Sequence, residues 1–181
     1  MKKSLLFSVL TLVIAVSFMS CASLPKKVKP GDTLVIGRVE VKTSGYENFM
    51  DVEFNGIFHD GIELTIRDQI TGKERTVLPN KDGCFYITGL KAHGTYGISK
   101  LKLTRHGISG AYSWLEFEIP NPKVIIPYDN MVVNTGCLYI YFDYTAGQVS
   151  WETKNHFYVN QFFQELEEDS EWFEKKMYNQ R

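Results

Sequence analysis

The sequence predicts a mainly β protein, an antiparallel β-sandwich of about seven strands followed by a C-terminal amphipathic helix. Short segments of alternating apolar and polar residues recur along the chain, which is typical of strands with one buried face. Asp82-Gly83 between two β-rich segments is a strong hairpin signal, because glycine tolerates the positive φ of such turns. After residue 153 the apolar spacing changes to steps of three and four, which is typical of a helix.

The N-terminal segment has the order of a secretory signal. Lys2 and Lys3 precede an almost wholly apolar or small segment that ends at Met19. The segment is short for a membrane span, which needs roughly 20 apolar residues. We therefore expect residues 1–20 to be an export signal rather than a membrane helix.

Phe18-Met19-Ser20-Cys21 resembles the lipobox of bacterial lipoproteins, although Phe18 and Met19 differ from the usual residue types. The resemblance implies cleavage before Cys21 and a fatty-acyl anchor, such as palmitate, on that cysteine. The alternatives are ordinary cleavage nearby, which leaves Cys21 a plain thiol, or no export. No aspartate follows the cysteine, as in lipoproteins sent to the outer membrane rather than the inner membrane.

Residues 21–32 are small, basic and interrupted by proline, as expected of a lipidated tether. Anionic lipid headgroups can attract its lysines, Lys26, Lys27 and Lys29. Removal of residues 1–20 would take Lys2 and Lys3 from the 20 basic residues and leave the 21 acidic residues in excess. A mildly acidic chain whose basic residues cluster only beside the anchor argues against a nucleic-acid partner.

Residues 33–152 are expected to form the sandwich domain. In the first strand, Val35, Val39 and Val41 share one face and polar residues occupy much of the other. The last strand is apolar on both faces, since Cys137, Tyr139 and Tyr141 lie opposite the face formed by Leu138, Ile140 and Phe142, and its second face needs a cover. The expected strands are 33–43, 62–67, 74–78, 84–88, 96–104, 114–119 and 132–145.

Residues 153–181 are expected to form an amphipathic helix packed on the sandwich. Thr153 or Asn155 can cap its start, and acidic residues occupy its remaining faces. We expect it to cover Tyr139 and Tyr141 on the last strand. Its apolar stripe consists of Val159, Phe162, Phe163, Leu166, Phe173 and Met177.

Cys84 and Cys137 have two open interpretations. An oxidising compartment permits a disulfide between them. Cysteines are equally often plain buried thiols. The sequence does not show whether their Cα atoms come within about 7 Å, which a disulfide requires.

Several segments resemble the carboxypeptidase regulatory-like family, a transthyretin-like β-sandwich. They are Gly37-Arg38-Val39, Ile62-Glu63-Leu64, Thr71-Gly72, Asp82-Gly83-Cys84-Phe85-Tyr86-Ile87, Gly89-Leu90 and Gly94-Thr95-Tyr96. The similarity covers Val35 to Leu103 and extends more weakly to Tyr144, with an insertion at 44–61 and an irregular stretch at 105–113. It implies a seven-stranded sandwich in a non-catalytic scaffolding or binding role.

No catalytic, cofactor or metal site is expected. None of His59, His93, His106 and His156 has a partner at zinc-ligand spacing. No G-x-S-x-G motif is present to expose a nucleophile, and the acidic C-terminal residues lack the glycine-containing loop of a calcium site. An envelope hydrolase is therefore the least favoured function.

Loop aromatic residues are the candidate contact residues. Tyr46, Phe49, Phe54 and Phe58 lie in the 44–61 insertion, and Tyr112, Trp114 and His106 flank the 105–113 loop. Such rings can anchor a protein partner, stack on a sugar, or cover the core under long loops. We expect a cell-envelope lipoprotein that contacts a protein partner, with carbohydrate binding as the alternative.

Overall fold

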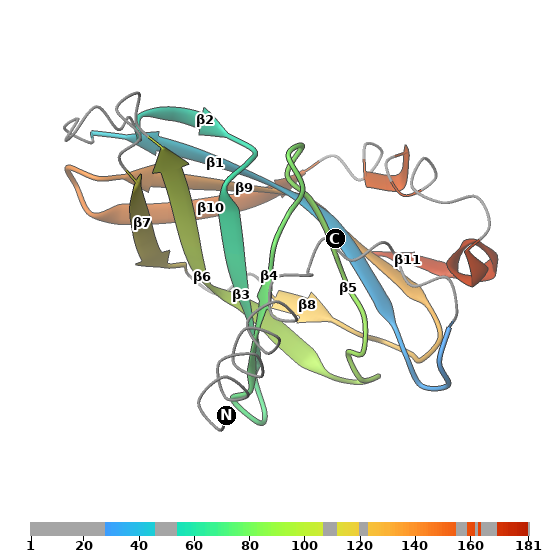
Figure 1. Ribbon diagram of the computed structural model, residues 1–181. Coiled ribbons are helices and arrows are strands. Elements are labelled where there is room, and N and C mark those ends of the chain that lie inside the picture. The colour runs from blue at the N-terminus through green and yellow to red at the C-terminus, as the bar shows by residue number, and fades with distance from the viewer. Residues whose placement is uncertain are drawn as a thin grey trace, which may run out of the picture.

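In a computed structural model, the chain folds as two β-sheets packed as a sandwich (Figure 1). The structure describes residues 28–45, 54–106, 112–119, 123–154, 159–161, 163 and 170–180. The predicted signal segment, Cys21 and most of the tether lie outside the described residues, as do Tyr46 and Phe49. No helix in the described ranges is long and apolar enough to cross a membrane.

The first sheet is built around β1 (Leu34–Ser44) and β9 (Val132–Asp143), which lie side by side along its length. The strand order is β10-β9-β1-β2, with β5 paired to β1 and β11 paired to β9. Its remaining strands are β2 (Gly56–Phe58), β5 (Cys84–Ile87), β10 (Gln148–Lys154) and β11 (Met177–Asn179).

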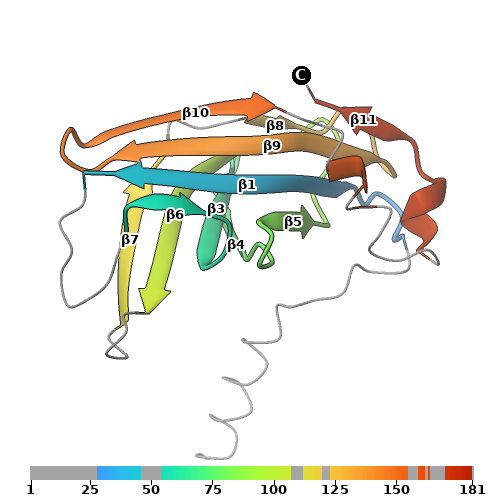
Figure 2. The same ribbon diagram turned by 90° about the horizontal axis from the view of Figure 1, so that it is seen from above.

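The second sheet has the order β4-β3-β6-β7, with β8 paired to β6. Figure 2 views the molecule so that β1, β9 and β10 form one layer and β3, β6 and β7 lie behind it. Its strands are β3 (Ile62–Asp68), β4 (Glu74–Val77), β6 (Thr95–His106), β7 (Tyr112–Glu118) and β8 (Lys123–Ile125).

The alternating residues of both sheets meet in one core between the layers. Val39 and Val41 from β1 are fully buried there, together with Leu101 and Leu103 from β6. Burying a side chain of this size stabilises the fold by about 1.5–3 kcal/mol. The hydrophobic alternation therefore identified the inward-facing positions of β1.

The predicted seven-stranded antiparallel arrangement differs from the structure in two respects. The described residues form a six-stranded and a five-stranded sheet, and β1 pairs with β9 in parallel. Short strands such as β2 and β8, with three residues each, are too brief to show an alternating pattern. The mainly β sandwich itself is confirmed.

The prediction of one amphipathic helix through the C-terminal segment is wrong. Of the described residues there, 159–161 and 163 are helical, and a 3-10 helix at Glu171–Glu174 is followed by the strand β11. The Ser170 side chain caps the 3-10 helix by accepting a hydrogen bond from the Trp172 backbone N–H at 3.4 Å. β11 forms because it pairs with β9 at Val132–Asn134, beyond the end of β10.

A second apolar cluster lies on the outer face of the first sheet. The C-terminal side chains Val159, Phe163 and Trp172 are at most 3% exposed there. They pack against outward-facing side chains of β1 and β9, with Tyr139 partly buried at the margin. The neighbouring Tyr141 remains 37% exposed, so the cover stops before it.

Candidate functional site

Cys84 and Cys137 are buried thiols that are not joined in a disulfide. In the register of the first sheet, both cysteines lie opposite Arg38, Cys84 on β5 to one side of β1 and Cys137 on β9 to the other. Two strand spacings put their Cα atoms roughly 9–10 Å apart, which exceeds the reach of a disulfide. Burial raises the pKa of the Cys137 thiol, an effect that the nearby Arg38 opposes. Burial therefore favours the protonated, less nucleophilic form of the Cys137 thiol.

Of the two predicted contact residues of the 44–61 insertion, one is fully buried and the other is partly buried. Phe54 is fully buried in the main core, which removes it from any contact surface. Phe58 packs against the same core, and the Arg105 guanidinium lies 4.0 Å from the centre of its ring. Arg105 also forms an ion pair with Asp60 at 3.3 Å, so this group closes one end of the sandwich.

Trp114 lies on the outer face of the second sheet, on the edge strand β7, and is 55% exposed. Its cross-strand partner is Thr104, while the adjacent Leu115 points into the core. The Lys102 ammonium lies 5.6 Å from the centre of the indole ring, within cation–π distance. The ring is thereby held against the sheet with part of its surface available to a ligand.

Charged residues of alternating sign lie across the three strands next to this ring. Lys102 is the cross-strand partner of both Glu63 and Glu116, so a basic residue lies between two acidic residues across three strands. We define the Trp114 face as Trp114, Thr104, Lys102, Glu116 and Glu63. It consists of one large exposed aromatic side chain within a polar surround.

The remaining two predicted contact residues are at the end of the same hairpin. His106 is exposed at the end of β6 and pairs with Tyr112 at the start of β7. The structure therefore brings the backbones of His106, Tyr112 and Trp114 together on two adjacent strands.

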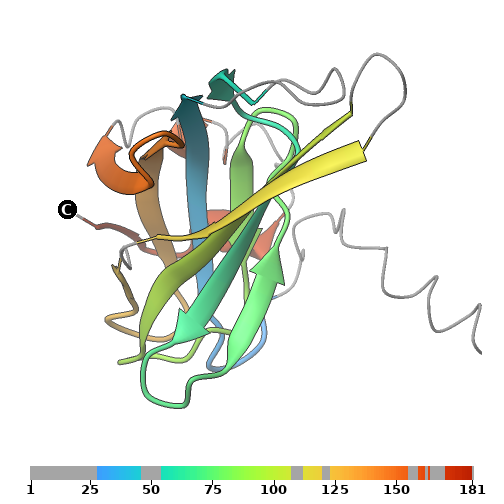
Figure 3. The same ribbon diagram turned by 90° about the vertical axis from the view of Figure 1, so that its left-hand side faces the viewer.

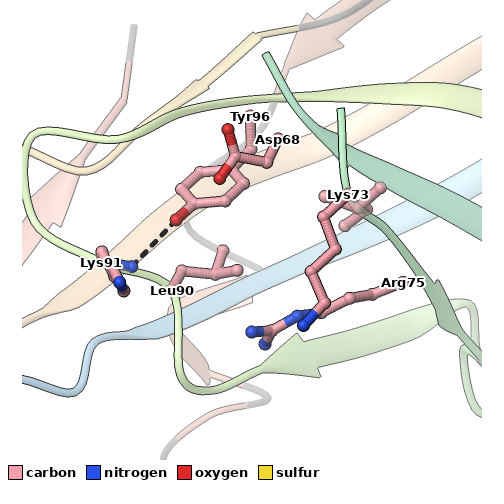
Figure 4. A pocket seen from close by; sticks show the side chains of 7 residues that line it. Asp68, Lys73, Arg75, Leu90, Lys91 and Tyr96 are labelled. Atoms are coloured by element: carbon pink, nitrogen blue, oxygen red, sulfur yellow. Dashed lines mark hydrogen bonds between the residues drawn. The ribbon is translucent and has the colours of Figure 1, made fainter. Parts of the chain in front are cut away.

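A pocket of about 170 Å³ opens on the second sheet, beside the turn that joins β3 to β4 (Figure 4). Its floor is apolar and its rim carries charged groups. We call it the basic pocket; its lining residues are Ile66, Asp68, Lys73, Arg75, Leu90, Lys91 and Tyr96.

Hydrogen bonds hold two of the charged groups of the basic pocket in place. Arg75 donates from its guanidinium to the carbonyl oxygens of Thr88 at 3.1 Å and Gly89 at 3.2 Å. The Asp68 carboxylate accepts from the backbone N–H groups of Ile70 and Thr71. These bonds are the main cause of a lowered pKa for Asp68, to which the Lys91 charge also contributes.

Tyr96 supplies part of the wall. Its hydroxyl accepts a hydrogen bond from the Lys91 backbone N–H at 2.9 Å, and its ring is 6% exposed. Figure 4 shows the ring beside Asp68, with Lys91 across the hydrogen bond. The loop after β5 is thereby fastened to the start of β6.

Nothing in the sequence pattern identified the basic pocket. Its three cationic residues come from β4 and two connecting loops, and lysine and arginine at such spacings are ordinary on solvent-exposed strands. No group of three or more His, Cys, Asp or Glu side chains in the described part of the chain is placed to hold a metal ion. The arrangement is suited to binding an anion.

Comparison with models of protein families, with curated proteins and with solved structures found no match. The fold is therefore characterised by the sheets themselves. The chain is a mainly β protein in which two sheets pack as a sandwich.

Proposed function

We propose that this chain is a non-catalytic, lipid-anchored β-sandwich of the cell envelope that binds a partner protein through the Trp114 face. The observation that carries this proposal is the 55% exposure of Trp114 on a regular strand. Tryptophan is on average one of the more buried residues. It is also enriched in binding hot spots, where a polar surround excludes water from a central aromatic anchor.

Placement of this face supports the proposal. Trp114 lies near the end of the β6–β7 hairpin, and β1 begins at the opposite end of the sandwich (Figure 1). A tether that leads from Cys21 to β1 would leave the Trp114 face directed away from the membrane. A partner protein could then reach this face without displacing the anchor.

The membrane anchor is proposed from the apolar segment that ends at Ser20-Cys21. The Cys21→Ala variant should lose incorporation of labelled palmitate and leave the outer-membrane fraction. Cys84→Ala is the matched control and should keep both properties, because Cys84 is buried in the sandwich. Equal labelling of the parent and Cys21→Ala would contradict the anchor.

The resemblance to carboxypeptidase regulatory-like domains supports the non-catalytic role. The residues that carry it include Asp82-Gly83 at the turn before β5 and Gly94 before β6. In that family the sandwich is usually a scaffold or docking appendage. We extend this role to the chain as part of the proposal.

Crosslinking in cells, followed by mass spectrometry of co-purified proteins, tests the partner. We expect one dominant protein with the parent and its loss with Trp114→Ala. Trp151→Ala is the matched control, because Trp151 is 38% exposed on the other sheet. Equal recovery with both variants would exclude the Trp114 face as the binding surface.

Carbohydrate binding is the second candidate, favoured by an exposed indole with hydroxyl and carboxylate groups beside it. A sugar ring could stack on the exposed part of the Trp114 ring, while the Thr104 hydroxyl donates or accepts hydrogen bonds and the Glu116 carboxylate accepts them. A panel of soluble glycans distinguishes the two functions. If the parent binds a glycan, Trp114→Ala loses this binding, and crosslinking enriches no protein, carbohydrate binding would replace the protein-partner proposal.

A further inference from the structure

The basic pocket lies at the end of the sandwich where β1 begins. β1 pairs with β5 at Val35–Ile87, and the chain after β5 leads directly to the lining residues Leu90 and Lys91. Asp32 lies beside this loop, since its carboxylate is 3.5 Å from where a Cβ of Gly89 would stand. Figures 1 and 3 both place the start of β1 and the β3–β4 turn at the same, lower end.

The charges of the pocket favour an anionic ligand. Among the lining residues, Lys73, Arg75 and Lys91 contribute three cations against the one carboxylate of Asp68, while the Asp32 carboxylate lies outside the lining beside Gly89. Asp68 is occupied by two backbone N–H groups of its own turn. Among the described residues, no carboxylate forms an ion pair with the Lys73 or Lys91 ammonium group.

Arg75 is a prepositioned donor in this pocket. Its two bonds to carbonyl oxygens use two of the five N–H groups of a guanidinium. The remaining N–H groups keep a fixed direction, which lowers the entropy cost of binding an oxyanion.

The size of the pocket restricts the ligand to a small group. Its 170 Å³ is several times the ~30 Å³ share of a water molecule in the liquid, but it is below the roughly 300–1,000 Å³ of sites that enclose a drug-sized molecule. A phosphate group fits this description, with the rest of its molecule outside.

Two exposed apolar side chains are at the same end. Ile70, in the turn between Asp68 and Lys73, is 81% exposed, and Tyr128, whose carbonyl accepts from Thr33, is 66% exposed. Apolar tips beside cations are suited to the interface between lipid headgroups and acyl chains. They extend the surface around the pocket without enclosing it.

We propose that the basic pocket binds a phosphate ester, and that its source is the headgroup of an anionic membrane lipid. The choice of source rests on the proposed Cys21 anchor, because the tether would hold this end of the sandwich against the membrane. Phosphate recognition itself depends only on Lys73, Arg75 and Lys91. A soluble phosphate ester shares the same chemistry and is distinguished by the experiment.

The first experiment measures binding of glycerol phosphate to the full chain in a neutral detergent by nuclear magnetic resonance. We expect saturable binding that weakens severalfold in the Lys73→Gln/Lys91→Gln variant and falls with added salt. Lys42→Gln/Lys81→Gln removes the same charge from two exposed residues outside the pocket and should bind as the parent does. Absence of binding by the parent, or equal binding by all three proteins, would overturn the site.

The second experiment identifies the source by lysine acetylation of the full chain in lipid vesicles. With phosphatidylglycerol present, Lys73 and Lys91 should react severalfold more slowly than in pure phosphatidylcholine, while Lys42 and Lys81 keep their rates. Protection by glycerol phosphate alone would support the pocket and assign a soluble ligand. No protection by either compound would overturn the proposal, independently of the Trp114 partner experiment.

Discussion

At the scale of single residues, Asn134 joins three parts of the chain. It is fully buried in β9, and its side-chain amide donates to the side-chain oxygens of Asn160 and Asn179, the latter at 2.9 Å. Its oxygen accepts from the Gly136 backbone N–H at 2.9 Å. These bonds can all form only when the C-terminal residues are in place, so Asn134 specifies where they pack.

Replacing Asn134 should therefore be costly. Asn134→Ala leaves the Gly136 N–H without this acceptor and is expected to lower the free energy of unfolding by about 1–3 kcal/mol. Urea denaturation measures the loss. The exposed Gln148→Ala should remain within about 0.5 kcal/mol of the parent, and a similar small effect for Asn134→Ala would contradict this role.

A comparison of two glycines with positive φ distinguishes the cost of backbone strain from the cost of steric crowding. Gly83 has φ of 78°, and a Cβ there would stand 2.2 Å from the Val39 carbonyl oxygen. Gly147 has φ of 62° with nothing within 4 Å. Gly147→Ala should cost about 1–2 kcal/mol from strain alone. Gly83→Ala should cost clearly more, because the Val39 backbone must also move; equal losses in thermal or urea unfolding would refute this.

At the scale of elements, the C-terminal segment acts as a cover for the outer face of the first sheet. Trp172, which is fully buried, follows the cap residue Ser170 in the 3-10 helix. Phe173 stacks on Phe163 with ring centres 4.9 Å apart. Phe163 belongs to the helical residues 159–161 and 163, whereas Trp172 and Phe173 belong to the 3-10 helix, and all three rings pack in the cluster on the outer face of the first sheet.

Removing the Trp172 side chain should destabilise the whole sandwich. Trp172→Ala opens a cavity under the C-terminal segment and is expected to lower the free energy of unfolding by about 3–5 kcal/mol. Trp151→Ala, at a site that is 38% exposed, should have a much smaller effect. Chemical denaturation compares the two variants, and equal losses would show that the cover contributes little.

The sequence predicts strands well where one face is buried and the other is exposed to solvent. β3 follows the expected alternation, with Ile62, Leu64 and Ile66 inward. The parallel pairing of β1 with β9 could not be predicted, because alternation describes a strand's faces and not its neighbours. The C-terminal helix was predicted too long because the helical spacing of Phe163 and Phe173 also suits two separate segments on one apolar surface.

The role of the candidate contact residues stays a prediction, but their exposure differs. Trp114 is exposed, whereas Phe54 from the insertion is a core residue. In the sequence, an aromatic residue in a long loop looks the same whether its ring is exposed or buried. Only the packing of the folded chain shows which of the two it is. The basic pocket was missed because Lys73 and Lys91, which line it together, are far apart in the sequence and belong to no motif.

At the scale of the molecule, the two proposed binding surfaces occupy opposite ends. β6 connects them: Thr95 starts near the basic pocket, and the strand continues for 12 residues to His106 beside the Trp114 hairpin. At about 3.3 Å per residue, the strand is roughly 40 Å long. This distance would separate a membrane-facing end from a partner-facing end.

Photo-crosslinking in cells tests this polarity. A photoreactive residue at position 70 should form adducts with lipid, because Ile70 is 81% exposed beside the basic pocket. The same residue at position 116 should form adducts with protein, because Glu116 borders Trp114 on the outer face. Gel mobility and mass spectrometry distinguish the products. Lipid adducts only at position 116 would show the reverse orientation. Lipid adducts at both positions would show that the two ends do not differ in their contact with the membrane.

The parallel pairing of β1 with β9 also affects the time at which the fold can form. Ile36 and Thr135, which share a hydrogen bond, are 99 positions apart. β1 can pair early with β2 and β5 on one edge, whereas its other edge must wait for β9, which lies far along the chain. Long-range pairing of this kind slows folding. Until β9 pairs, β1 exposes an unpaired, aggregation-prone edge, and assistance from a chaperone should increase the yield of folded protein.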